Sequence, residues 1–160
     1  MSQSSPDPTP ARLRTVPSRL LAQAATVADR IVGDRLAAEG ARKWYFAVLV
    51  ALAETGPTSQ AELSRRTGIY RSDMVAVLNE LAATDCIHRT PDPADRRRNT
   101  ITLTPAGHHR LARLDALVTE AETELLTPLT PTQQHDLTHL LTLLTTHHRP
   151  THHHPPRTTP

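Results

Sequence analysis

The segment Asp92-Pro93-Ala94-Asp95-Arg96-Arg97-Arg98-Asn99 decides the fold of this 160-residue chain. Two short runs rich in β-branched and apolar residues flank it, Cys86-Ile87-His88-Arg89-Thr90 and Thr100-Ile101-Thr102-Leu103-Thr104. Such runs on either side of a loop with Pro and Asp predict an antiparallel hairpin with a long tip. Three consecutive arginines at the tip repel one another unless an anion neutralises them, and a phosphate backbone does so while releasing counterions. The hairpin is therefore predicted to contact nucleic acid.

Two short helical patterns lie just upstream of the hairpin. Ser59 and Glu62 form a capping-box pattern at the start of the first pattern, and Gly68 ends it. The second pattern runs from about Arg71 to Ala83. Its inward-facing apolar stripe consists of Met74, Leu78 and Leu81. A helix-turn-helix followed by a basic hairpin is a winged helix, and this combination predicts double-stranded DNA as a partner.

Longer helical patterns surround this module and exceed what a compact DNA-binding head requires. Their apolar stripes need a partner, so we expect intertwining with a second copy; the alternative is that they cap their own monomer. The predicted fold class is mainly α (an α+β winged helix), a helix-turn-helix with a two-stranded wing flanked by N- and C-terminal dimerisation helices. The predicted organisation is a disordered arm (1–14), a dimerisation helix (15–40), the winged helix-turn-helix domain (41–107), C-terminal dimerisation helices (108–147) and a disordered His/Pro/Thr tail (148–160).

Composition argues against several other classes of protein. No apolar run has the length of a membrane span, and the N-terminus lacks the apolar stretch of a signal peptide. A lone cysteine, Cys86, fits a reducing compartment, so we expect a cytoplasmic protein. No Gly-rich phosphate loop, nucleophile elbow or paired-carboxylate pattern is present, which predicts no enzyme activity, no catalytic residues and no cofactor. Ten histidines invite a metal hypothesis, but their spacing does not define a closed ligand set, and no metal site is predicted.

The stretch from Ala47 to Leu111 resembles the MarR family of winged-helix transcription regulators. The most specific match is Arg89-Thr90-Pro91-Asp92-Pro93-Ala94-Asp95-Arg96-Arg97, which resembles the family's wing signature. Leu103-Thr104-Pro105-Ala106-Gly107 resembles the helix restart that follows the wing, and Ser59-Gln60-Ala61-Glu62-Leu63 resembles the opening of the helix-turn-helix. The chain departs from the family at Asp85, where a glycine is usual.

The resemblance implies an obligate homodimer on a pseudo-palindromic operator. The recognition helix would enter the major groove and the wing would lie along the adjacent minor groove. Arg97 would reach that minor groove with Asp95 as its partner; the alternative is a surface ion pair of little energetic consequence. Arg96 and Arg98 fit phosphate contacts and solvated charges equally well. Many relatives are repressors that a small ligand releases from DNA.

The recognition helix supplies further candidate contacts with DNA. Arg71 and Asn79 can bond base edges, and Ser72 suits a phosphate. The outward face of the helix also carries Asp73, Val75 and Ala76. Asp73 could orient Arg71, accept from a cytosine amine, or stabilise the helix N-terminus. Three further candidates are Ser59 and Gln60, at a helix start suited to a phosphate, and Tyr70, which could touch a phosphate or pack between helices.

The segment Arg42, Lys43, Trp44 and Tyr45 puts aromatics beside two cations, where relatives form an effector pocket. This segment could bind a small aromatic or anionic effector. Alternatively, its aromatic side chains could pack in the core, and we favour core packing for at least two of Trp44, Tyr45 and Phe46.

The alternative to a DNA-binding regulator is a protein-interaction or metal-binding module that uses the His-rich tail and the long helices.

Overall fold

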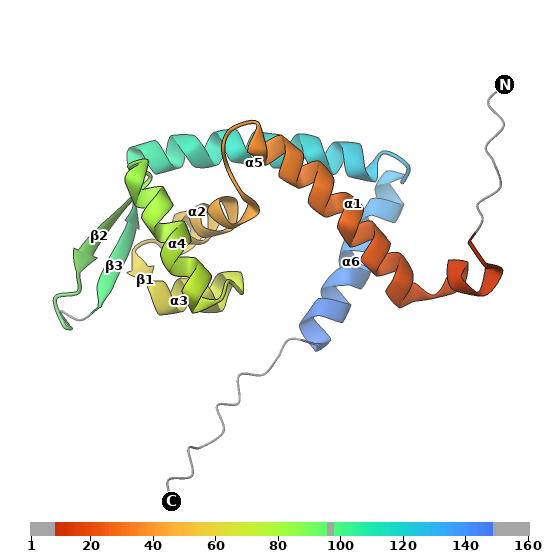
Figure 1. Cartoon of the computed structure of the whole chain (residues 1–160), viewed down its shortest axis with the longest axis horizontal. Coiled ribbons are helices and arrows are strands. Elements are labelled where there is room, and N and C mark those ends of the chain that lie inside the picture. Colours follow the sequence, from red (N-terminus) through yellow and green to blue (C-terminus); the bar gives the residue numbers. More distant parts are fainter. Residues whose placement is uncertain (1–8, 96–97, 149–160) are drawn as a thin grey trace, which may run out of the picture. The chain divides into compact units, whose positions relative to one another are not determined.

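A computed structural model describes residues 9–95 and 98–148 as a mainly helical protein with a small antiparallel sheet (Figure 1). It divides after Leu125 into two compact units, which are described separately. In chain order the elements are the 3-10 helix η1 (Ala11–Thr15), α1 (Pro17–Ala37), α2 (Lys43–Thr55), β1 (Thr58–Ser59), α3 (Gln60–Thr67), α4 (Arg71–Ala83), β2 (Ile87–Pro91), β3 (Asn99–Leu103), α5 (Pro105–Leu126) and α6 (Pro131–His147).

The helix-turn-helix consists of α3 and α4, and its boundaries follow from local chemistry. Ser59 is the N-cap of α3 and its hydroxyl accepts from the Glu62 N–H at 3.3 Å. Gly68 ends α3 in the left-handed conformation with φ of +72°, which glycine adopts without steric cost. The bounds of α4 are those that the sequence predicted, so the winged-helix prediction is confirmed for this part of the chain.

The sheet has three strands in the order β1-β3-β2, one more than the predicted two-stranded wing. The hairpin pairs β2 with β3, with Arg89 opposite Ile101 and Ile87 opposite Leu103. The extra strand β1 pairs with β3 through Thr58 opposite Ile101. A strand of two residues has no periodicity for a sequence pattern to reveal. Its pairing attaches the start of α3 to the base of the wing.

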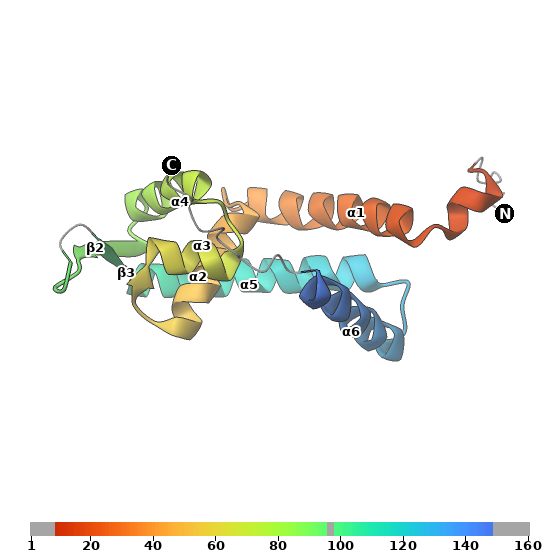
Figure 2. The ribbon, with the colours of Figure 1, turned by 90° about the horizontal axis from the view of Figure 1, so that it is seen from below.

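The core of the first unit is aliphatic and lies where α2, α3 and α4 pack against the sheet. Its inner stripe on α4 contains the predicted Met74, Leu78 and Leu81, together with Val77. Leu36 near the end of α1 and Leu114 of α5 complete the same core. Figures 1 and 2 show α1 and α5 extending from this head.

Ion pairs join α1 and its C-terminal turn to α5. The Arg35 guanidinium lies 2.7 Å from Glu120 and 2.8 Å from Glu124. Beyond this connection the N-terminal half of α1 keeps large apolar side chains in solvent, with Leu20 47% and Val27 42% exposed. These residues belong to the stripe that was predicted to need a partner.

The second unit contains α6, which starts with a capping box between Thr130 and Gln133. Four of its leucines are exposed, namely Leu140, Leu141, Leu143 and Leu144. Among residues 9–95 and 98–148, no helix combines the length and apolar content that a membrane span needs.

The N-terminal arm departs in part from its prediction. Residues 1–8 lie outside the described part of the chain, but Ala11–Thr15 form η1, although 1–14 were expected to lack structure. The segment contains Ala, Leu and Arg, which favour helical backbone, and it follows Pro10, whose carbonyl accepts from the Leu13 N–H at 2.9 Å.

Candidate DNA-binding surface

The outward face of α4 has the composition expected of a surface that reads DNA. Five of the six predicted contacts on this face are exposed, and only Asp73 is half-buried; the exposed residues are Arg71, Ser72, Val75, Ala76 and Asn79. Val75 is 45% exposed although it is apolar, because the helix turns its other face to the core. This face offers amide, guanidinium and hydroxyl groups beside methyl groups, which together match the edges of base pairs.

Tyr70 and Asp73, at the start of α4, each have alternative predicted roles, and their exposure and contacts bear on them. Tyr70 is 79% exposed, so it does not pack between helices and its hydroxyl is free to meet a phosphate. Asp73 is half-buried in the first turn of α4, and no ion pair joins it to Arg71. The carboxylate lies in the first turn of α4, where it stabilises the positive end of the helix dipole, and its acceptance of a hydrogen bond from a cytosine amine stays a prediction.

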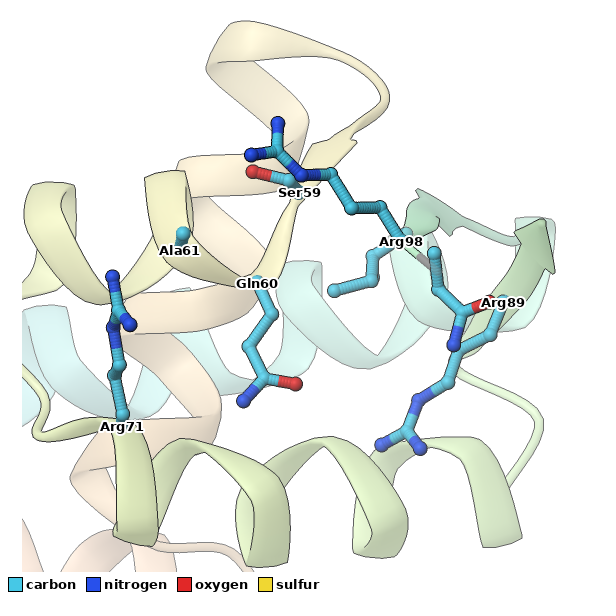
Figure 3. Close-up of a pocket in the computed structure, with 8 residues that line it drawn as sticks. Ser59, Gln60, Ala61, Arg71, Arg89 and Arg98 are labelled. Atoms are coloured by element: carbon cyan, nitrogen blue, oxygen red, sulfur yellow. The ribbon is translucent and has the colours of Figure 1, made fainter. Parts of the chain in front are cut away.

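A cavity of about 390 Å³, here called the arginine groove, opens between α3, α4 and the wing (Figure 3). Its lining residues are Ser59, Gln60, Ala61, Arg71, Arg89, Arg98, Asn99 and Ile101. In Figure 3 the Gln60 amide and the Arg89 guanidinium group point toward α4, whereas the Arg71 guanidinium group points from the start of α4 toward α3, near Ala61. The groove thus concentrates positive charge and amide donors at one place.

The sheet register explains why Arg89 faces the groove. Directly opposed residues of antiparallel strands share one face of a sheet, and Arg89 is opposite Ile101. Ile101 is buried beneath the groove, with 1% of its surface exposed. Asn99 lies two residues before Ile101 and shares its face. Arg89 was not among the predicted contacts. Its spacing of two from the buried Ile87 is the signal that could have found it.

The arginines of the groove differ in their partners. Arg98 lies 3.6 Å from the Asp95 carboxylate, and its side chain is 72% exposed. Within the described ranges, the side chains of Arg71 and Arg89 form neither an ion pair nor a hydrogen bond, whereas those of Arg35, Arg42 and Arg65 each pair with a carboxylate. The groove therefore carries uncompensated positive charge. The predicted wing-tip contacts Arg96 and Arg97 lie outside the described residues, so the Asp95–Arg97 pairing stays a prediction.

Comparison with known proteins also indicates a DNA-binding transcription regulator. A model of the MarR family matches residues 42–98. The transcriptional repressor NicR of Pseudomonas putida is 37% identical over 73 residues, which are 46% of this chain and 44% of NicR. A probable transcriptional regulator from Pseudomonas aeruginosa is 32% identical, with a TM-score of 0.75 over 83% of this chain and 99% of that one. The chain belongs to the MarR family.

A further solved structure matches in fold. BpsR of Bordetella bronchiseptica, whose DNA binding is regulated by 6-hydroxynicotinic acid, is 23% identical, with a TM-score of 0.76 over 86% of this chain and 98% of that one. The chain spans less than half of NicR and less than two thirds of the other curated relatives that it matches. The two structural matches confirm the predicted fold class, a mainly α protein with a winged helix.

The segment predicted as an effector pocket in this MarR protein connects α2 to α4. The Arg42 guanidinium and the Tyr45 hydroxyl both donate to the Glu80 carboxylate, and the Arg42 guanidinium lies 5.2 Å from the centre of the Tyr45 ring. Lys43 pairs with Asp29 of α1. These contacts place both cations in ion pairs and join the start of α2 to the recognition helix.

The aromatic side chains of this segment divide as expected between core and surface. Tyr45 and Phe46 pack partly buried against the core, and Trp44 is 42% exposed.

Cys86 is a free, buried thiol just before β2. Over residues 9–95 and 98–148, no group of three or more His, Cys, Asp or Glu side chains could hold a metal ion.

Proposed function

We propose that this MarR-family chain is a homodimeric, sequence-specific DNA-binding transcriptional regulator, a repressor that a small-molecule effector relieves. The observation that carries the proposal is the uncompensated arginine groove beside the exposed polar face of α4. Phosphate contacts supply affinity and base contacts supply specificity, and this surface places the two side by side. The rival assignment, a protein-interaction or metal-binding module, is not favoured, because the homologues are transcription regulators.

The homodimer is supported by the apolar side chains that the long helices leave in solvent. On α1 these are Leu20, Leu21 and Val27, and on α6 they are four leucines. Burying apolar surface stabilises association by about 25 cal/mol per Å², so both stripes favour pairing with a second copy. Two heads on a two-fold axis would meet half-sites about one helical turn apart. Sedimentation of the full chain as a monomer at the concentrations used for DNA binding would contradict this part.

Effector control is supported by the contacts around Glu80. A small aromatic or anionic molecule that competes for Arg42 or Tyr45 would change the contacts of Glu80, which lies on the recognition helix. The proposed partners are therefore a pseudo-palindromic operator, a second copy of the chain and such an effector, in the cytoplasm and without a membrane or a cofactor.

The direct test selects duplexes from a random-sequence pool with the full chain and measures their binding by fluorescence anisotropy. We expect an enriched palindromic sequence and an affinity that falls as salt rises. Arg97→Ala should weaken operator binding by about 1–3 kcal/mol. Binding of Arg97→Ala at wild-type strength would refute the role of the wing tip, and failure to enrich any sequence would refute the function.

A further inference from the structure

We propose that Thr104 is the positioning residue that fixes the angle between α5 and the head, which consists of α3, α4 and the three-stranded sheet. Through this angle the Thr104 hydroxyl sets the spacing of the two half-sites that the dimer reads. The inference rests on the proposed homodimeric DNA-binding function and deepens it, because it assigns operator spacing to one buried side chain that does not itself contact DNA.

A single residue connects the wing to α5. The strand β3 ends at Leu103 and α5 begins at Pro105, so the backbone angles of Thr104 decide the direction in which α5 leaves the sheet. A proline restricts the residue before it to extended backbone. The Thr104 N–H also donates to the Cys86 carbonyl at 3.1 Å, which continues the pairing of the hairpin by one residue. The backbone at this joint therefore has little freedom.

The Thr104 side chain bonds both sides of the joint. Its hydroxyl donates to the Asp85 carbonyl at 2.5 Å, in the turn after α4, and accepts from the Gly107 N–H at 2.9 Å, in the first turn of α5. Over residues 9–95 and 98–148, Thr104 is the only polar residue that is buried, with 3% of its surface exposed. Hydrogen bonds away from water are stronger, and leaving one of their partners unpaired is costly. The hydroxyl thus joins the end of the recognition helix firmly to α5.

Helix capping alone does not account for these contacts. The bond with the Gly107 N–H is an ordinary N-cap contact, which stabilises the start of α5 and nothing else. The bond with Asp85 instead joins two segments 19 residues apart. Asp85 has a left-handed backbone with φ of +55°, and such a conformation persists only where neighbouring contacts hold it in place. The second bond therefore serves to orient two elements.

The length of α5 turns a small change of angle into a large displacement. The helix has 22 residues and is therefore about 33 Å long. A change of about 5° at Thr104 would move the far end of α5 by about 3 Å relative to the head, close to the DNA rise of about 3.4 Å per base pair. Since α5 is one of the proposed dimerisation helices, a stiff joint holds the two heads at one spacing and a loose joint does not.

The first experiment measures how strictly the full chain selects that spacing. Operators with one base pair inserted or removed between the half-sites, and a duplex with a single half-site, are compared with the selected operator by fluorescence anisotropy. The wild type should bind both altered spacings about tenfold more weakly, because each head then meets its half-site out of position. Thr104→Val, which keeps the side-chain shape but removes the hydroxyl, should bind all three spacings within about threefold of one another and the single half-site like the wild type.

Two further variants serve as controls. Thr104→Ser retains the hydroxyl and should restore the wild-type preference for one spacing. Thr102→Val makes the same chemical change two residues earlier on β3 and should also keep that preference. Sedimentation and far-UV circular dichroism establish that each variant is a folded dimer at the temperature of the binding measurements.

A second route to the same joint covers the case in which Thr104→Val does not fold. Pro105→Ala retains the Thr104 hydroxyl and removes the restriction on the Thr104 backbone. It should also narrow the difference in affinity between the three spacings. A folded Pro105→Ala dimer that selects one spacing as strictly as the wild type would contradict the inference.

The remaining outcomes separate the inference from the function on which it rests. A folded Thr104→Val dimer that keeps the tenfold preference would overturn the inference. Equal weakening of the single half-site and the selected operator would also overturn it, because that result indicates damage within the head. A wild type that binds the operator but accepts all three spacings alike would overturn the inference and leave the function intact. A wild type that binds no DNA would overturn both.

Discussion

Among the five glycines of the chain, Gly107 is the only one at which an added Cβ atom would meet a neighbour within 4 Å, at the base of the wing. A Cβ atom added at Gly107 would lie 2.1 Å from the Cys86 carbonyl oxygen and 2.6 Å from Cδ1 of Leu103. The first neighbour is backbone and cannot rotate away. The Cys86 N–H donates to the Leu81 carbonyl at 2.9 Å and the Cys86 carbonyl accepts from the Thr104 N–H at 3.1 Å, so moving it breaks hydrogen bonds.

The cost of Gly107→Ala can be worked from this geometry. Relieving the overlap requires a shift of about 1 Å between α5 and the wing, and overpacking of this kind costs about 1–3 kcal/mol. Loss of one of the Cys86 backbone hydrogen bonds adds about 0.5–1.5 kcal/mol. The better helix propensity of alanine returns about 0.5–1 kcal/mol. We therefore expect a destabilisation of about 2–3 kcal/mol.

Thermal and urea unfolding, followed by far-UV circular dichroism at one fixed protein concentration, measure this cost. A fixed concentration is necessary because association shifts the apparent stability. We expect the melting temperature of Gly107→Ala to fall by about 5–10 °C. The matched control is Gly33→Ala in α1, where an added Cβ meets nothing within 4 Å and should leave stability unchanged or raise it slightly. Equal melting temperatures for Gly107→Ala and the wild type would refute the packing argument.

Two further predictions concern backbone strain and pH. Asp85 has a φ of +55°, a conformation that costs an L residue free energy, so Asp85→Gly should raise the free energy of unfolding by about 0.5 kcal/mol in urea titrations; a lower midpoint would contradict this. Arg65, and then Arg66, hold the pKa of the Glu62 carboxyl below its usual range. Since the pKa is lower in the folded state, the charged form stabilises the fold above the unfolded pKa of about 4.3 and this contribution is lost as pH falls through the folded value. The stability difference between the wild type and Glu62→Gln should therefore be constant near neutral pH and shrink in acid, and a difference that does not change with pH would be the contrary result.

Helix boundaries were predictable because their signals are local. Ser59 and Gly68 mark the ends of α3 by hydrogen bonding and by backbone conformation, and α4 has the predicted bounds. The capping box predicted at Ser59 is only half formed, because the Glu62 carboxylate turns to Arg65 and Arg66. The sequence gives no means of weighing that competition, since both partners lie within one helical turn of the carboxylate.

The site was predictable where it depends on one helix and hidden where it depends on pairing between strands. The 3.6-residue period places Val75 and Asn79 on the exposed face of α4, and the structure agrees. The spacing of two between Ile87 and Arg89 indicates which face of the strand Arg89 shares, but its place opposite Ile101 depends on the strand register, which no local pattern specifies. The sequence also could not show that Arg71 and Arg89 lack acidic partners, because carboxylates distant in sequence could have folded beside them.

The segment that resembles the family's helix restart, Leu103 to Gly107, joins the wing to α5 and bonds to the turn after α4. The Thr104 hydroxyl donates to the Asp85 carbonyl at 2.5 Å and accepts from the Gly107 N–H at 2.9 Å. One side chain thus bonds the turn after α4 to the first turn of α5, at the point where Gly107 contacts Cys86. If α5 contributes to the dimer as we propose, a change in the dimer that moves α5 must carry the end of the recognition helix and the base of the wing with it. Closely packed contacts of this kind do not deform continuously. A movement of α5 in the dimer would therefore alter the spacing between the two heads and leave each arginine groove intact.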